Sequence, residues 1–175
     1  MTIKEIFLKF QGNPDFREWE KKNSNAYLVH FFFMDEPGAA WQMGHYDDDT
    51  KAMTSFTLEN DSVKIQEEKD VFQKEPEKIR PIIIDDVKRD FEEIKKAALA
   101  FQKTDYPGEL PLKAMYVLQN LKDYGQIWNV TIFTRTFKTL NMKFDSSSGE
   151  LLEHNLAKLF DMEPGQGGKE ANIPQ

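Results

Sequence analysis

The chain contains no cysteine among its 175 residues. This absence excludes disulfide bonds, thiolate catalysis and metal sites built on cysteine ligands. Positive charge is also scarce, because 23 Lys and Arg face 30 Asp and Glu, for a net charge of -7. A nucleic-acid-binding surface needs clustered Lys and Arg to replace phosphate counterions, so this balance argues against a nucleic-acid partner.

Long apolar runs are missing as well. No stretch approaches the roughly 20 apolar residues that span a bilayer. The first ten residues, MTIKEIFLKF, lack the basic segment, apolar core and small-residue cleavage site of a signal peptide. We therefore expect a cytoplasmic protein with no membrane partner. What the chain does have is 39% hydrophobic residues, including 14 Phe, which is enough for a sizeable core.

Two short helices are predicted at the N-terminus. Thr2 and Glu5 have the spacing of a capping box, and Asn13 followed by Pro14 is typical of a second helix start. The apolar stretch 26–34 then predicts a central strand that is covered on both faces. Three further strands are predicted at 41–46, 51–59 and 63–65.

The second half of the chain has a similar order of elements. A helix capped by Asp85 is predicted, because apolar residues from Val87 to Phe101 recur at alternating spacings of four and three. A strand follows at 113–121, and the alternation within 128–152 predicts two strands joined by a Gly turn. A brief strand is expected at 82–84, and a short closing helix is expected from Leu156, Leu159 and Phe160.

The repeated order predicts the fold class. Trp41 and Trp128 each begin the second strand of a unit. We expect an α+β protein with two helix-plus-antiparallel-β-meander units that share a continuous sheet. A chance similarity between two meanders is the alternative. The predicted division is a first half at 1–67, a charged connector at 68–84, a second half at 85–162 and a disordered tail at 163–175.

One candidate site joins two histidines and a carboxylate. If Met34 lies opposite Trp41, His30 lies directly opposite His45, and Asp47 follows on the same face. Two imidazoles and a carboxylate are a ligand set for a divalent metal such as iron or zinc. The alternative is a pair of histidines satisfied by hydrogen bonds, and a slip of one residue in register would separate them.

The second candidate is the polar face of the segment 128–152. Its alternation places apolar residues on one side of the two strands and polar residues on the other. Such a face suits a peptide or a small ligand, and its basic groups suit an anion. A plain solvated outer face is the alternative, although Phe133 is an apolar residue on the polar side, where a helix or a partner subunit would cover it. The candidate residues are Asn129, Thr131, Phe133, Arg135, Asn141 and Lys143.

The same segment resembles a PepSY-type module. The likeness covers 85–152 and rests on the ending MKFDSSSGEL, in which Asp145 starts a turn and Gly149 allows a positive φ. The resemblance implies a small α+β binding or regulatory module of the cystatin-like kind. Peptidase inhibition is the role usually suggested for such modules, which are commonly exported or linked to a membrane. The family offers no catalytic residues to transfer.

No hydrolase or phosphate-binding motif is present: the chain has no GxSxG, and no strand precedes the glycines at 165–168. The preferred function is therefore non-enzymatic binding or regulation, with no resident cofactor. Two alternatives stay open. One is a metal-dependent enzyme that uses His30, His45 and Asp47, and the other is a structural homodimer subunit.

Overall fold

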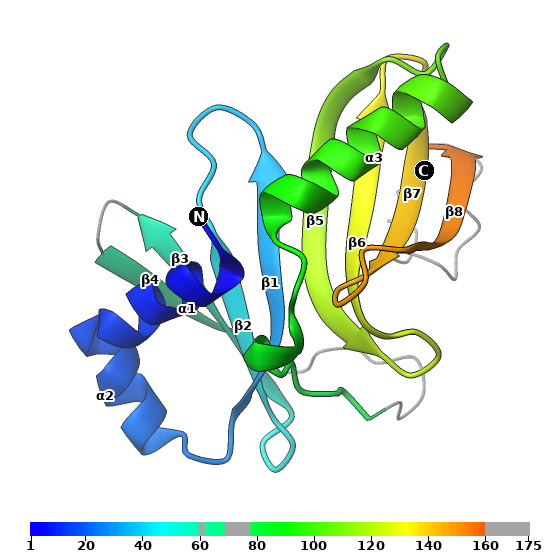
Figure 1. The fold of residues 1–175 in the computed structure, drawn as a ribbon. Helices are drawn as coiled ribbons and strands as arrows, with labels where there is room; N and C mark the ends of the chain where they lie inside the picture. Colours follow the sequence, from blue (N-terminus) through cyan, green and yellow to red (C-terminus); the bar gives the residue numbers. More distant parts are fainter. Residues whose placement is uncertain (60–61, 69–77, 160–175) are drawn as a thin grey trace, which may run out of the picture.

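The computed structural model describes residues 1–59, 62–68 and 78–159 (Figure 1). Within these ranges the chain is an α+β protein with a single eight-stranded antiparallel sheet of order β4-β3-β2-β1-β5-β6-β7-β8. The helical elements are α1 (Ile3–Gly12), α2 (Pro14–Lys22), the 3₁₀ turn η1 (Ile84–Asp86) and α3 (Phe91–Asp105). The strands are β1 (Tyr27–Asp35), β2 (Gln42–Asp47), β3 (Ala52–Glu59), β4 (Ser62–Glu68), β5 (Pro111–Leu121), β6 (Gly125–Thr134), β7 (Lys138–Asp145) and β8 (Leu151–Lys158).

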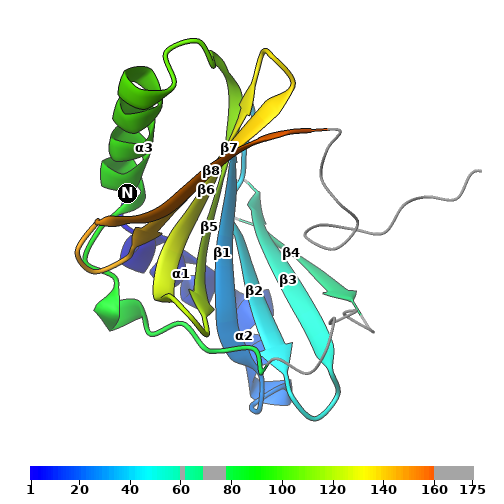
Figure 2. The ribbon, with the colours of Figure 1, turned by 90° about the vertical axis from the view of Figure 1, so that its right-hand side faces the viewer.

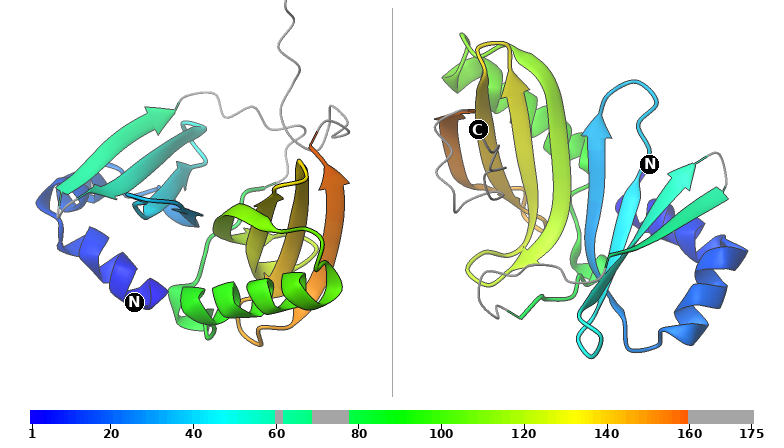
Figure 3. Two further views of the ribbon diagram at one scale, coloured as in Figure 1. Left: turned by 90° about the horizontal axis from the view of Figure 1, so that it is seen from above. Right: turned by 180° about the vertical axis from the view of Figure 1, so that it is seen from behind.

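All three α-helices of the described chain lie on one side of this twisted sheet (Figure 2). Seen from behind, the strands stand in front of the helices (Figure 3). Helices α1 and α2 cover the half formed by β1 to β4, and α3 runs over β5 to β8 (Figure 1). The opposite side of the sheet, on which no described helix packs, is called the open face below.

The two N-terminal helices begin where the sequence predicts. The Thr2 hydroxyl accepts from the Glu5 backbone N–H at 3.1 Å, and the Glu5 carboxylate accepts from the Thr2 N–H at 2.7 Å. The Asn13 side chain accepts from the backbone of Asp15 at 2.9 Å, at the start of α2. Phe10 and Phe16 are fully buried, so the apolar faces of both helices pack on the sheet.

The start of α3 differs from the prediction. The helix begins at Phe91, after the N-cap Asp90, whose backbone N–H donates to the Glu93 carboxylate at 3.0 Å. Asp85 lies in η1 and forms an exposed ion pair with Lys4. The sequence places the cap too early because Val87 continues the apolar spacing of the helix, although it adopts extended backbone.

Two short elements are also corrected. Residues 82–84 form no strand; the side chain of Gln126 instead bonds both backbone groups of Ile83, at 2.6 and 3.1 Å. The predicted helix around Leu156 is wrong, because β8 pairs with β7 in this region and places Leu156 opposite Leu140. The predicted tail at 163–175 lies outside the described residues, as does most of the connector at 68–84.

Phe91 is the centre of the core and joins the two halves of the sheet. Its ring lies 5.1 Å from the ring of Phe33 and 5.2 Å from that of Trp41, both in the first half. It also lies 4.9 Å from the ring of Tyr116 and 6.4 Å from that of Trp128 in the second half. One buried apolar cluster therefore runs under the whole described sheet.

The central strand β1 is covered on one face, and the prediction of cover on both faces is wrong for the described chain. Leu28 and Phe31 belong to the buried core. Phe32 and Met34 point to the open face and are half-buried. The side chains of neighbouring strands shield them, because β1 lies in the middle of the sheet with β2 on one side and β5 on the other.

Candidate functional site

The open face presents an ordered change from apolar to polar residues across four strands. Register places Phe32 opposite Val117, Val117 opposite Asn129, and Asn129 opposite Lys143. A parallel row runs through Met34, Met115, Thr131 and Asn141. Directly opposed residues of an antiparallel sheet project from the same face. Four residues thus form an apolar strip along β1 and β5, namely Phe32, Met34, Met115 and Val117.

Next to this strip lies an amide cluster of Asn129, Thr131 and Asn141. The Asn141 side-chain N–H₂ donates to the Asn129 carbonyl at 2.8 Å and to the Thr131 hydroxyl at 2.9 Å. Asn141 thereby uses both of its donors. The Asn141 carbonyl, the Asn129 N–H₂ and the Thr131 O–H keep hydrogen-bonding capacity toward solvent. The cluster is half-buried, and Thr131 is only 9% exposed.

Lys143 lies on the same face but is already paired. Its ammonium donates to the Glu153 carboxylate of β8 at 2.7 Å and lies 4.5 Å from the centre of the Tyr124 ring. Tyr124 also donates its hydroxyl proton to Glu153. These contacts, led by the one from Lys143, hold the pKa of Glu153 below its usual value. The positive charge of Lys143 is therefore paired within the protein and is less available to bind an anion.

Of the remaining two predicted residues, Phe133 lies on the open face with the others and Arg135 does not. Phe133 is half-buried on the open face, and the ammonium of Lys113, its directly opposed neighbour, lies 5.4 Å from the ring centre. Lys113 therefore partly covers Phe133, where the sequence predicts a helix or a partner subunit. Arg135 lies beyond the end of β6, in the exposed turn to β7, and its backbone N–H donates to Leu110. The structure thus brings together five of the six predicted residues.

The predicted pairing of the two histidines is wrong. An irregularity between Leu28 and His30 shifts the register, so that His30 lies opposite Gly44 and His45 lies opposite Leu28. The His30 ring fills the space over Gly44, where an added Cβ would be 2.1 Å from the ring. Gly44 and His45 are consecutive in β2 and point to opposite faces. His30 therefore faces the open side while His45 faces the helices.

His45 is buried among aromatic rings. Phe16, Trp19 and Phe56 each place a ring centre 5.5 Å from the imidazole, and the Nδ1 atom has no hydrogen-bond partner. Desolvation, and secondarily the nearby His30, lower the pKa of His45 to about 4. His45 is therefore a neutral core residue at neutral pH.

Asp47 builds a turn. Its carboxylate accepts from the backbone N–H of Asp49 at 2.8 Å and of Thr50 at 3.2 Å. Across residues 1–59, 62–68 and 78–159, no group of three or more His, Asp or Glu side chains is arranged to hold a metal ion. The ligand set predicted from His30, His45 and Asp47 thus loses the geometry on which it was based.

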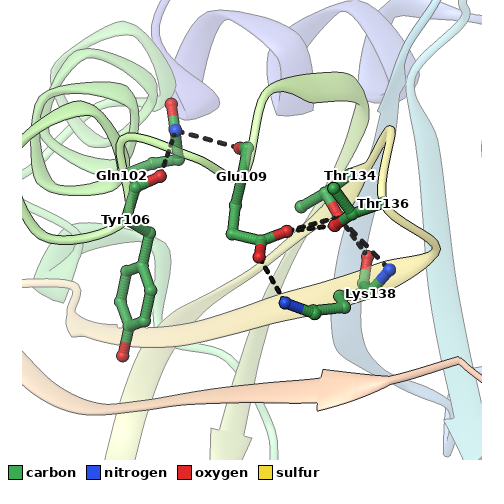
Figure 4. A network of polar contacts seen from close by, with 6 residues as sticks. All are labelled: Gln102, Tyr106, Glu109, Thr134, Thr136 and Lys138. Carbon is green, nitrogen blue, oxygen red and sulfur yellow. Dashed lines mark hydrogen bonds and ion pairs between the residues drawn. The ribbon is translucent and has the colours of Figure 1, made fainter.

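A polar network around Glu109 was not predicted. Glu109 is 9% exposed, and its carboxylate accepts from the Lys138 ammonium and the Thr136 hydroxyl, and from the Thr134 hydroxyl at 3.2 Å (Figure 4). The Lys138 hydrogen bond is the main cause that lowers the pKa of Glu109. Gln102 donates to the Glu109 carbonyl at 3.0 Å, so the network fastens the end of α3 to the β6–β7 hairpin. Glu109 is 25 to 29 residues from its three partners in the hairpin, and nothing in the sequence between Pro107 and Pro111 indicated more than a helix end.

Comparison with known proteins supports the fold alone. No known family model matches the chain, and no curated protein sequence matches it. Among solved structures, the chain is similar to a "putative lipoprotein" from Clostridium difficile 630, with a TM-score of 0.56 and 14% identity over 81% of this chain and 90% of that one. The resemblance to PepSY-type modules therefore stays a prediction. Among the described helices, none has the length and apolar character needed to cross a bilayer.

Proposed function

We propose that this protein is a non-catalytic binding protein that holds an extended segment of a protein partner on its open face. The observation that carries the proposal is the amide cluster of Asn129, Thr131 and Asn141. It presents an acceptor and several donors side by side. A peptide group needs one acceptor for its N–H and one donor for its C=O. The cluster is therefore chemically matched to a peptide backbone.

The apolar strip supplies the second half of the proposed recognition. Val117 lies directly opposite Asn129, and Met115 lies directly opposite Thr131. Neighbouring strands are about 4.8 Å apart. The centre of the apolar strip on β1 and β5 is about two strand spacings from the centre of the amide cluster on β6 and β7, which is about 10 Å. An extended peptide covers that distance in about three residues. The expected ligand has an apolar side chain about three residues from the peptide group that bonds Asn141.

The arrangement of the strands supports a finer view of the fold. Each half of the sheet is a four-strand meander that starts at the centre of the sheet and continues to its edge. The first meander is β1-β2-β3-β4, and the second is β5-β6-β7-β8. Helices precede each meander. We infer that the two halves are copies of one helix-plus-meander unit. In this view the open faces of both units adjoin at β1 and β5.

A random dodecapeptide display library, selected on the purified full-length chain, tests the binding proposal. We expect enriched peptides with the apolar spacing described above. Asn141→Ala should weaken their binding about tenfold. It removes the Asn141 carbonyl as an acceptor, and it removes the hydrogen bonds that orient Asn129 and Thr131. Val117→Thr keeps the β-branched shape but reduces apolar contact, and should also weaken binding.

Lys103→Ala is the matched control, since Lys103 is exposed on α3 on the other side of the sheet. It should bind the selected peptides as the unchanged chain does. Far-UV circular dichroism verifies that each variant is folded. Equal affinity of the unchanged chain, Asn141→Ala and Val117→Thr would contradict the proposal, as would a selection that enriches no peptide.

A further inference from the structure

A groove lies between α2 and β4, on the helical side of the sheet and away from the open face. Its volume is about 390 Å³. The apolar part of the lining comes from Trp19, Val63 and Ile65. The charged part comes from Asp15, Glu18 and Lys22, all on α2. The groove therefore has an apolar floor and a charged rim.

One wall of this groove is the edge of the sheet. Strand β4 pairs with β3 and is the last strand in the sheet order of the described chain. The outer backbone groups of such a strand can pair with another extended chain. Strand β4 carries the charged residues Lys64 and Glu67, as exposed edges usually do, but between them Ile65 is a large apolar residue that is 38% exposed. Its position is explained if a partner covers it.

The charged residues of the rim indicate which charge a partner of the groove should carry. Lys22 donates to the Glu18 carboxylate at 2.7 Å, so these two charges are paired. The Asp15 carboxylate forms no ion pair with another described residue, although its backbone is bonded to Asn13. Trp19 follows one helical turn later, on the same side of α2. The groove thus has a carboxylate outside any ion pair with a described residue, in the first turn of α2 and one helical turn from an indole ring, and both groups attract a cation.

We propose that the groove accepts an extended, basic segment of a partner protein, which pairs with the backbone of β4. On β4 the alternate residues Val63 and Ile65 face α2. Alternate residues of an added strand face α2 in the same way. The segment therefore places an apolar side chain on Ile65 and Trp19, and a Lys or Arg two residues away, next to Asp15. This site is independent of the open face and of the proposed function there.

A second copy of the chain fits this groove less well. The β4 residues that face α2 include Glu67 and no basic residue. Two β4 edges paired with each other would bring the acidic rims of two grooves together. The net charge of -7 per chain adds long-range repulsion.

Three synthetic nonapeptides test this inference on the full-length chain. The matching peptide is TTKTITKTT, the charge-reversed peptide is TTETITETT, and the peptide TKTTITTKT has the composition of the first without its spacing, because each Lys is three residues from the Ile and lies on the other face of a strand. Fluorescence anisotropy measures their affinities, and hydrogen exchange reports on the β4 amides. We expect TTKTITKTT to bind, to protect the β4 amides, and to bind at least tenfold more tightly than either of the other two.

Variants of the groove complete the test. Asp15→Lys should weaken the binding of TTKTITKTT at least tenfold, and Ile65→Thr should weaken it while keeping a β-branched residue in the strand. Asp105→Lys makes the same change of charge at an exposed site on α3 and should have no effect. Three results would overturn the inference: no saturable binding, equal affinity for the charge-reversed peptide, or an unchanged affinity in Asp15→Lys. Sedimentation velocity that shows a dimer abolished by Ile65→Lys would also overturn it, in favour of a second copy.

Discussion

At the scale of single residues, the positions with the clearest physical constraints are the two histidines of the first half. His30 is accommodated because its opposite residue, Gly44, has no side chain. His45 is accommodated because three aromatic rings surround it, although this environment leaves its Nδ1 atom without a hydrogen-bond partner. An unpartnered buried polar atom of this kind destabilises the folded state by about 1–3 kcal/mol.

The burial of His45 predicts a dependence of stability on pH. Its pKa is lowered to about 4 in the folded protein, mainly by desolvation, while an unfolded histidine titrates near 6.5. Between these values the unfolded state binds more protons, so the free energy of unfolding decreases as the pH falls through this window. From pH 7 to pH 5, His45 alone should lower the free energy of unfolding by about 2 kcal/mol. The pKa of His30 is also lowered by desolvation, and its effect has the same sign.

Urea denaturation at pH 7.0 and pH 5.0, for the unchanged chain and for His45→Leu, measures this effect. The comparison is made between two pH values within each protein, so any change of stability from the substitution itself cancels. We expect the loss at pH 5.0 to be smaller in His45→Leu by about 2 kcal/mol. The same loss in both proteins would show that His45 is not the buried neutral group described above.

At the scale of elements, the turn between β7 and β8 shows how local sequence and tertiary contacts act together. The Asp145 carboxylate accepts from the backbone N–H of Ser147 at 2.9 Å and of Ser148 at 2.6 Å, as the sequence predicts for the start of a turn. Gly149 has a φ of +78°. The turn also contacts the segment before α3, since the Ser146 carbonyl accepts from the backbone of Arg89 at 2.9 Å. It therefore fixes both the hairpin and the approach to α3.

Gly149→Ala should destabilise the protein by about 1–2 kcal/mol, because a residue with a Cβ is strained at this φ. The Arg89 side chain adds to the cost, since its Cγ lies 3.2 Å from where the new Cβ would be. Gly108→Ala is the control, because a Cβ there meets nothing within 4 Å. Urea denaturation of both variants measures the difference. Equal stability of the two would show that the turn does not require glycine.

The elements that the sequence predicted correctly depend on short-range signals. The capping box of Thr2 and Glu5 and the Asn13-Pro14 start are formed by residues within one turn of each other. The prediction of a closing helix failed because the same spacing of apolar residues is compatible with a helix and with a strand. The predicted closing helix was based on Leu156, Leu159 and Phe160, and the four-residue spacing of Leu156 and Phe160 places two residues on one face of a helix and equally on one face of a strand. Pairing with β7 decides between the two, and no local pattern carries that information.

At the scale of the whole molecule, the two halves share one sheet and one buried core. Six residue pairs join β1 to β5 across the middle of the sheet. Below them Phe91 contacts Phe33 and Trp41 from one half and Tyr116 from the other. Opening either half would therefore expose apolar surface of the other. We expect a single two-state unfolding transition for the described fold.

Tryptophan variants check this cooperativity, because Trp19 and Trp41 report on the first half and Trp128 reports on the second. One variant carries Trp19→Phe and Trp41→Phe, and the other carries Trp128→Phe. In each variant, the fluorescence midpoint in urea should coincide with the midpoint from far-UV circular dichroism, which follows the whole sheet. A separation of the midpoints in either variant would indicate halves that unfold independently.

The candidate site shows the same division between local and tertiary information. Alternation within one strand put Asn129, Thr131 and Phe133 on one face, and the structure agrees. Alternation could not show that Glu153 neutralises Lys143, or that Lys113 covers part of Phe133, because those partners come from other strands. It also could not place Arg135, which continues the pattern in sequence but lies beyond the end of the strand.

The sequence by itself determined the class of the fold, the positions of most strands and the first two helices, since these depend on periodicity and on capping residues close in the chain. Only the tertiary structure decided the register of β1 on β2, and with it the separation of His30 from His45. One irregularity in a strand moves each later side chain to the other face, and its position depends on how well the whole sheet packs. The tertiary structure also decided which face the described helices cover, and therefore on which face the amide cluster and the apolar strip stay uncovered by them.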